Sequence, residues 1–285
     1  RLSFRALQLD QVDRLEIDDQ VSTVLIRQGD GWFIEGGRRA ENSSVERALE
    51  AVTKIESTKL LTRKAERFAE LNVDADTGVE VRVSGQGREL ARFVIGSGGP
   101  GTSSVRVGAE VFSVPGVYAG TFKRKGTGWA DRTLIDLKPH DIARVSVSVE
   151  AETFVLVAEG AGWRLEDESI KPEGFRFDSQ GAAELVSAFT GLRVREFIET
   201  VPDNELTGLG AGAAVVRVEP KAEGSEAVIL KIGSVRSDET VYASLSTGDV
   251  FTVSKHTAET LATKLVGLRD LGLLRFEAEK VLELE

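Results

Sequence analysis

The chain has 285 residues, 41% of them apolar, no cysteine and a formal net charge of −10. The absence of cysteine excludes disulfides, thiolate zinc sites and a cysteine nucleophile. Residues 1–140 carry 21 Lys and Arg against 20 Asp and Glu, and the remainder carries 15 against 26, so the acidic second half offers no footprint for nucleic acid. The length predicts about two domains.

The chain opens with three short segments that alternate or run apolar and are separated by Asp and Gly turns. They lie at residues 12–17, 23–28 and 32–35. This pattern is typical of a β-meander. Gly31 stands before the bulky Trp32, as expected at a hairpin turn.

A helix is predicted next. The sequence Ser-Ser-Val-Glu at 43–46 resembles a capping box, in which a serine oxygen accepts a free helix N–H and Glu46 reaches back. Val45, Leu49 and Val52 fall on one face of the helix. We expect it to continue to about residue 61.

A second meander follows the helix, with strands expected at 79–84, 89–95, 105–107 and 111–114. A second, weaker helix is predicted over 116–125.

The same landmarks then return. Gly-Asp-Gly-Trp-Phe-Ile at 29–34 recurs as Gly-Ala-Gly-Trp-Arg-Leu at 160–165, and Ile-Gly-Ser at 95–97 recurs at 232–234. Landmarks that recur in the same order indicate an internal repeat. The second meander of this copy is expected at 213–219, 227–232, 241–245 and 250–253.

The helices of the second copy are predicted on the same grounds. Asp178 or Ser179 is expected to cap the main helix, which buries Leu185, Phe189 and Leu192. A second helix is expected over 255–268.

The predicted fold class is therefore α+β: two tandem copies of a mostly antiparallel β-meander domain, each with one main and one lesser helix. We expect the first repeat domain at 1–139 and the second at 140–285. The last predicted strand, at 281–284, either completes the second copy or begins a third. Trp32 and Trp163 are expected to lie in the two cores, where each indole N–H would need a partner.

Two glycine-rich stretches resemble nucleotide loops. Residues 96–101 fit G-x-G-x-x-G literally, but a dinucleotide site requires that turn to open a helix, and here a strand-like segment follows. Residues 208–212 also lead into a predicted strand. We interpret both as loops and expect no nucleotide cofactor.

Other possible sites are incomplete. Asp76, Thr77 and Gly78 match the aspartic-protease triplet, but the second copy supplies no partner carboxylate. Asp74 and Asp76 lack the further ligands of a calcium loop. The two histidines, His140 and His256, form no metal-ligand spacing. The sequence thus predicts no catalytic, cofactor-binding or metal-binding residues.

The basic-aromatic cluster Lys123, Arg124, Lys125 and Trp129 is the candidate for contact with a partner. Such a group binds a phosphate or an acidic protein surface. The alternative is a solvated loop, because three exposed charges contribute little alone.

Several landmarks together resemble the bacterial domain of unknown function 4340, which often occurs in tandem. They are the Gly-Trp after the second strand, the capped helix, Glu-Leu-Asn-Val-Asp at 70–74, Ile-Gly before a Val-Phe-x-Val hairpin, and Asp131-Arg132-x-Leu134. The proline usual after the Gly-Leu-Asp turn of the family is absent from both copies. The resemblance implies an N-terminal membrane anchor and genes beside an ABC transporter of the gliding-motility type. It implies no catalytic residues.

Three functions are considered. The first is a non-enzymatic extracytoplasmic module that serves a membrane transporter complex or another envelope protein. The second is a periplasmic protein that binds a small ligand or an envelope polymer in the cleft between the copies. The third, an enzyme, lacks an evident acid, base or nucleophile. The chain begins with Arg1, which fits a trimmed signal or anchor on the periplasmic side of the inner membrane, and fits a truncated cytosolic protein as well.

Overall fold

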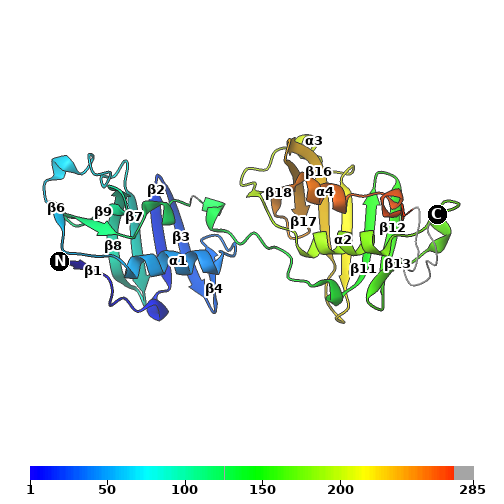
Figure 1. Ribbon diagram of the computed structural model, residues 1–285, viewed down its shortest axis with the longest axis horizontal. Helices are drawn as coiled ribbons and strands as arrows, with labels where there is room; N and C mark the ends of the chain where they lie inside the picture. Colours follow the sequence, from blue (N-terminus) through cyan, green and yellow to red (C-terminus); the bar gives the residue numbers. More distant parts are fainter. Residues whose placement is uncertain (125, 273–285) are drawn as a thin grey trace, which may run out of the picture. The chain divides into compact units, whose positions relative to one another are not determined.

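The computed structural model describes residues 1–124 and 126–272, and the chain divides into two compact units, Arg1–Arg132 and Thr133–Glu285 (Figure 1). The division lies a few residues before the boundary predicted at 139/140. Thr133 forms an antiparallel bridge with Arg193, which ties the segment before Pro139 to the second unit. The strand predicted at 281–284 lies outside the described residues.

Each unit is built on one eight-stranded antiparallel sheet. The order is β4-β3-β2-β7-β8-β9-β10-β6 in the first unit and β13-β12-β11-β15-β16-β17-β18-β14 in the second. The strands of the first sheet are β2 (Arg14–Asp19), β3 (Val21–Gln28), β4 (Gly31–Ile34), β6 (Leu60–Thr62), β7 (Val79–Gly85), β8 (Arg88–Ser97), β9 (Thr102–Val107) and β10 (Glu110–Pro115). Those of the second are β11 (Ile142–Val149), β12 (Glu152–Glu159), β13 (Gly162–Leu165), β14 (Glu196–Phe197), β15 (Ala214–Pro220), β16 (Val228–Ser237), β17 (Thr240–Leu245) and β18 (Val250–Ser254).

The landmarks of the repeat fall in corresponding strands of the two sheets. Trp32 lies in β4 and Trp163 in β13, each at the same end of its sheet. Gly96 lies in β8 and Gly233 in β16, each fifth in order. The α+β class and the antiparallel meanders predicted from the sequence are confirmed.

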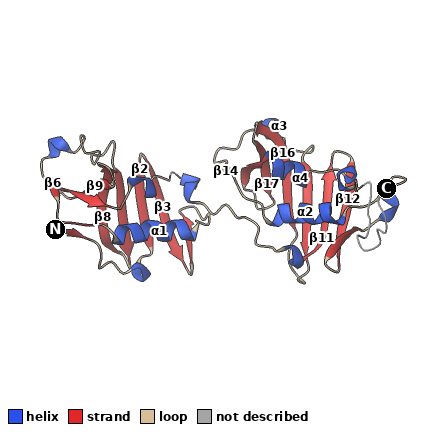
Figure 2. Cartoon of the chain, viewed as in Figure 1, coloured by secondary structure: helices blue, strands red, loops and turns tan. Residues whose placement is uncertain are grey.

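One long helix crosses one face of each sheet (Figures 1 and 2). These helices are α1 (Asn42–Thr53) and α2 (Ser179–Thr190). Alternate strand residues point toward the helix and form the core, as in β7, where Val79, Val81 and Val83 are fully buried while the intervening side chains are half-buried. No helix among the described residues is both long and apolar enough to cross a bilayer.

The caps of the two main helices differ. Asp178 caps α2 by accepting a hydrogen bond from the Gln180 amide at 3.0 Å, as predicted. The capping box predicted for α1 is wrong: the helix begins earlier, with Glu41 at the cap position and no side-chain cap. Ser44 is buried inside the first turn and donates to the Glu41 carboxylate.

Three predicted helix lengths are also wrong. Helix α1 ends at Thr53, not near 61, because the residues that follow join strands β5 (Glu56–Ser57) and β6, and β5 pairs with β1 (Leu2–Ser3). The helix expected over 255–268 is α4 (Lys255–Leu261) followed by a separate 3-10 turn. The lesser helix of the first copy is only a 3-10 turn at Ala119–Thr121.

The Ile-Gly landmark has a steric cause. A Cβ atom on Gly96 would lie 2.0 Å from the carbonyl oxygen of Asn72, and one on Gly233 would lie 2.1 Å from that of Thr207. In both units a loop backbone therefore packs directly on the sheet where only glycine leaves room. In the first unit this loop places Phe68 and Val73 against Val94, on the sheet face opposite α1.

The glycine contact predicts a matched pair of sensitive sites. Gly96→Ala and Gly233→Ala should each lower the free energy of unfolding by about 1–3 kcal/mol, because the loop must move away. Gly120→Ala and Gly212→Ala are the controls, since nothing lies within 4 Å of a Cβ there. Urea denaturation measures all four. Equal losses at the tight and the open sites would contradict the steric explanation.

Trp32 is 1% exposed and its ring fills the core beside α1. Trp32→Ala should therefore cost about 3–5 kcal/mol of unfolding free energy in denaturant melts. Tyr118→Ala provides the control, because Tyr118 is 53% exposed. A loss below about 1 kcal/mol for Trp32→Ala would show that the ring is not part of the core.

Candidate functional site

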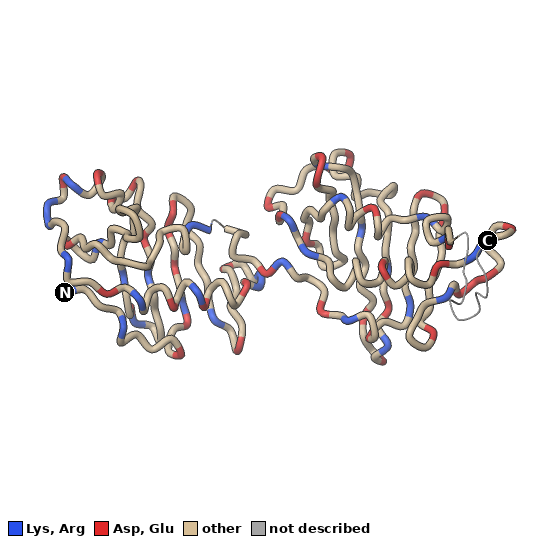
Figure 3. The backbone as a smooth tube through the Cα atoms, in the orientation of Figure 1, with Lys and Arg blue, Asp and Glu red and all other residues tan. Residues whose placement is uncertain are grey.

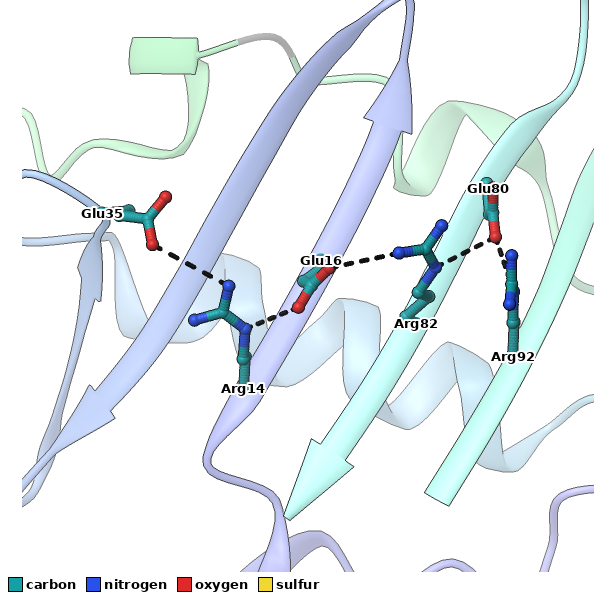
Figure 4. A network of polar contacts seen from close by, with 6 residues as sticks. All are labelled: Arg14, Glu16, Glu35, Glu80, Arg82 and Arg92. Carbon is teal, nitrogen blue, oxygen red and sulfur yellow. Dashed lines mark hydrogen bonds and ion pairs between the residues drawn. The ribbon is translucent and has the colours of Figure 1, made fainter. Parts of the chain in front are cut away.

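The sheet face of the first unit that points away from α1 carries a row of alternating charges, which we call the charge ladder. Figure 4 shows its side chains in front of the strands, with α1 behind them. Its members are Glu35, Arg14, Glu16, Arg82, Glu80 and Arg92. Strand register brings them together: Glu16 is paired with Arg82 between β2 and β7, and Arg82 with Arg92 between β7 and β8.

The ladder is a continuous chain of contacts. Arg14 Nε donates to Glu16 Oε1 at 2.6 Å, and Arg82 Nη1 lies 3.7 Å from Glu16 Oε2. Glu80 Oε1 then accepts from Arg82 Nε at 3.0 Å and from Arg92 Nε at 2.7 Å. Glu80 thereby binds both Arg82 and Arg92, which face each other across β7 and β8.

These contacts shift the pKa of three members of the ladder. Partial burial alone would raise the pKa of Glu80, but the hydrogen bonds from Arg82 and Arg92 outweigh it, so this pKa lies below its ordinary value. The hydrogen bond to Glu16 raises the pKa of Arg14, and the one to Glu80 raises that of Arg82. The contacts thus favour the charged forms of Arg14, Glu80 and Arg82.

The second unit does not repeat the ladder. Register places Ser146 where Glu16 stands, Val215 where Glu80 stands and Ile229 where Arg92 stands. Arg144 and Arg217 remain. Arg144 pairs with Glu166, which stands where Glu35 stands in the first unit, and Arg217 pairs with Glu219. The two sheets have similar inward-facing positions, each in its own core, and differ in the face that they present to solvent. Figure 3 shows the charged positions along both sheets.

The structure separates the members of the predicted basic-aromatic cluster. Lys123 is exposed, whereas Trp129 is fully buried, so its ring belongs to the core and cannot form an exposed contact. The Arg124 guanidinium lies 5.4 Å from the centre of that ring and donates to Ser44 Oγ at 2.8 Å. Lys125 lies outside the described residues. Arg124 therefore serves mainly to hold its own loop.

The indole nitrogens of Trp32 and Trp129 are buried without a hydrogen-bond partner among the described residues. The sequence-based expectation that a buried Trp32 N–H would have a partner is thus wrong within this part of the chain. Arg27 and Arg124 lie over the two rings instead, at 5.3 and 5.4 Å from the ring centres, and supply cation–π contacts.

The glycine-rich stretches are turns. The loop at 96–101 joins the antiparallel strands β8 and β9, and the Thr102 amide donates to the Gly99 carbonyl at 3.0 Å. The stretch at 208–212 joins the short helix α3 (Asn204–Thr207) to β15. Neither opens a helix, in agreement with the sequence-based interpretation.

The residues that the sequence analysis weighed and set aside as sites are structural or exposed. Asp74 Oδ1 accepts from the Thr77 hydroxyl at 2.6 Å and from its amide at 2.9 Å, and the hydroxyl contact is the main reason that the pKa of Asp74 is lowered. His140 is exposed and lies 3.4 Å from Asp141. His256 is exposed in α4. No group of three His, Asp or Glu side chains in the described ranges could hold a metal ion.

A hollow of about 480 Å³ in the first unit lies at the end of the ladder and is lined in part by Glu80, Arg92 and Arg106. A hollow of about 530 Å³ in the second unit is lined in part by the glycine-rich stretch at 208–212 and by Gly233. Sequence reasoning missed both the ladder and the hollow beside it, because each depends on strand register. The available signal was the pair of charges two residues apart in β2 (Arg14, Glu16) and again in β7 (Glu80, Arg82).

Comparison with known proteins identifies one family. The family model described as Domain of unknown function (DUF4340) matches residues 32–212, more than half of the chain. The match runs from β4 of the first unit to the segment before β15 of the second. No curated protein and no solved structure shows significant similarity to the chain.

The lowered pKa of Glu80 predicts a pH-dependent contribution to stability. The stability that the ionised Glu80 side chain contributes is complete above the ordinary glutamate pKa of 4.5. It is lost as the pH falls through the lower pKa of Glu80 in the folded state. Glu80→Gln should therefore lower the unfolding free energy by about 0.5–1 kcal/mol at pH 7 and by less near pH 3. Urea melts across this range measure it, with the exposed Glu46→Gln as the control. A difference that grows toward acid pH would contradict the prediction.

Proposed function

We propose that this chain, which belongs to the DUF4340 family, is a non-enzymatic interaction module of an extracytoplasmic, membrane-anchored assembly, and that its partner is the membrane part of an ABC-type transporter. The observation that carries the proposal is the charge ladder, which one copy of the duplicated sheet has and the other lacks.

The ladder has the properties of a recognition surface. Its side chains are about one-quarter to three-fifths exposed, and they are held in place by one another on the sheet. Complementary charge gives a contact its register and its specificity, and it excludes partners that present like charges. The second copy, which has Ser146, Val215 and Ile229 at three of these positions, does not present the same pattern of charge.

The electrostatics argue against a carboxyl group acting as a general acid. A carboxyl group in that role at neutral pH needs a raised pKa. The carboxyl groups with resolved shifts in the described residues all shift downward; they are Glu56, Glu70, Asp74, Glu80 and Asp167. These groups suit ion pairing, which supports a binding role.

The membrane anchor, the extracytoplasmic location and the transporter partner are implied by the family resemblance. The alternative function, binding of a small ligand or an envelope polymer, stays a prediction.

Site-specific photocrosslinking tests the proposal. A crosslinking side chain at Ser22, exposed beside Asp18 at the end of β3, reports on the ladder face of the first unit. Thr153 occupies the matching position of the second unit, opposite Ser148, and is also exposed. We expect crosslinks to a transporter membrane subunit from position 22, reduced about ten-fold by Glu16→Lys with Glu80→Lys.

The position at 153 is the matched control and should give no such product. Equal crosslinking from both positions would remove the ladder from the contact. If neither position crosslinks to the transporter and a soluble envelope-polymer fragment raises the melting temperature, the ligand-binding alternative is favoured.

A further inference from the structure

We infer that the free edge of β8, over residues 88–93, takes up an extended segment of a partner protein as an added β-strand. This inference rests on the proposed function and deepens it, because it names the place and the kind of contact. Strand addition is a recurring mode of peptide recognition in which main-chain hydrogen bonds supply the affinity.

The pairing of β8 shows the free edge. Strand β7 pairs with β8 along its whole length, from Gly85 opposite Arg88 to Val79 opposite Ile95. On the other side, β9 pairs only with residues 94–97 of β8. Within the described ranges, no strand pairs with residues 88–93 on that side.

The second unit closes the same edge. There β17 pairs with β16 as far as Leu230, and the Ser246 amide donates to the Ile229 carbonyl at 2.9 Å. The register of the two sheets places Arg92 at the position of Ile229. The amide and carbonyl of Arg92 therefore point toward the open edge, because both groups of a residue in an antiparallel ladder face the same neighbour.

The two units diverge where β9 ends. Strand β9 stops at Val107, and the chain turns at Gly108, whose φ is 57°. The hollow of about 480 Å³ lies in the space that a longer β9 would occupy, since Arg92, Phe93, Val107 and Gly108 all line it. This space matches a few residues of extended chain.

The walls of the hollow define the segment that fits. One wall is apolar and half-buried: Phe4, Leu90 and Val107 all pack against the main core. The centre of the Phe4 ring lies 5.7 Å from the centre of the Phe93 ring. A segment with apolar side chains at alternate positions would cover this wall.

The opposite wall is charged and is the end of the ladder. Arg92 is exposed here, and Arg106 lies beside it on β9. Glu89 is paired with Ser84, next to the pair of Val83 with Ala91 across a register shift that skips Leu90, and is also exposed. Charges of opposite sign stabilise a strand pair when they lie on residues that face each other across it. The segment should therefore carry an acidic residue facing Arg92 and a basic one facing Glu89.

The test uses the full chain and a capped peptide of alternating valine, glutamate, valine, lysine and valine. Hydrogen exchange of the Arg92 amide, followed by NMR, should slow at least about ten-fold at saturating peptide. The amide of Ile229 should not respond, because its edge is already paired. Unchanged exchange at Arg92 with millimolar peptide would overturn the inference.

A charge swap identifies the contact. Arg92→Glu should weaken binding of the peptide about ten-fold, and a peptide with lysine in place of its glutamate should restore it. Lys231→Glu, on the exposed face of β16, is the control and should leave binding unchanged. Exchange of the Val81 amide shows that each variant is folded. Loss of binding in Arg92→Glu without rescue by the swapped peptide would contradict the assigned register.

The two proposals fail separately. Crosslinks from position 22 to the transporter together with an unprotected Arg92 amide would overturn strand addition and leave the proposed function standing. Protection of the Arg92 amide by the peptide, without any crosslink to the transporter, would overturn the proposed function and leave strand addition standing.

Discussion

The contact between the Asn72 carbonyl and Gly96 organises the first unit. Because residue 96 has no side chain, the preceding loop lies directly on the sheet, and Phe68, Leu71 and Val73 cover Val94 and Val111. The loop shields only this part of the face opposite α1. Strands β2 and β7 and the first half of β8 stay uncovered, and there the outward positions carry the ladder. A single steric requirement thus divides one sheet face into a buried part and an exposed charged part.

The second unit obeys the same constraint with a different result. The Thr207 carbonyl lies against Gly233, so its loop occupies the same place. The outward positions hold serine, valine and isoleucine where the first unit holds glutamate and arginine. The inward positions must still fill a core, and a change there costs packing free energy, whereas an outward change on an exposed strand costs little. The two copies are therefore free to differ where a partner would bind and constrained where they fold.

The fold could be predicted from sequence because its signals are local. Alternation with a period of two and glycine turns located nearly every strand of the two meanders. The helix ends could not be predicted, because residues 56–62 have a competing tertiary use in β5 and β6. The ladder was not visible either, since Glu16, Arg82 and Arg92 come together only through register. Trp129 is grouped with Lys123, Arg124 and Lys125 in the sequence as a candidate contact cluster, but its ring is buried and the Arg124 side chain lies over it.

An unpaired strand edge in a stable sheet is a hazard, because any extended chain can pair with it. Charged side chains commonly protect such edges, and here Arg88, Glu89 and Arg92 are all exposed. Charges of both signs at defined positions do more than repel: they reject a segment whose charges are wrong and accept one whose charges alternate in the complementary order. The apolar wall formed by Phe4, Leu90 and Val107 adds a second requirement on the alternate side chains. Protection of the edge and selection of a partner are then one property of the same few residues, and the paired edge of β16 needs neither.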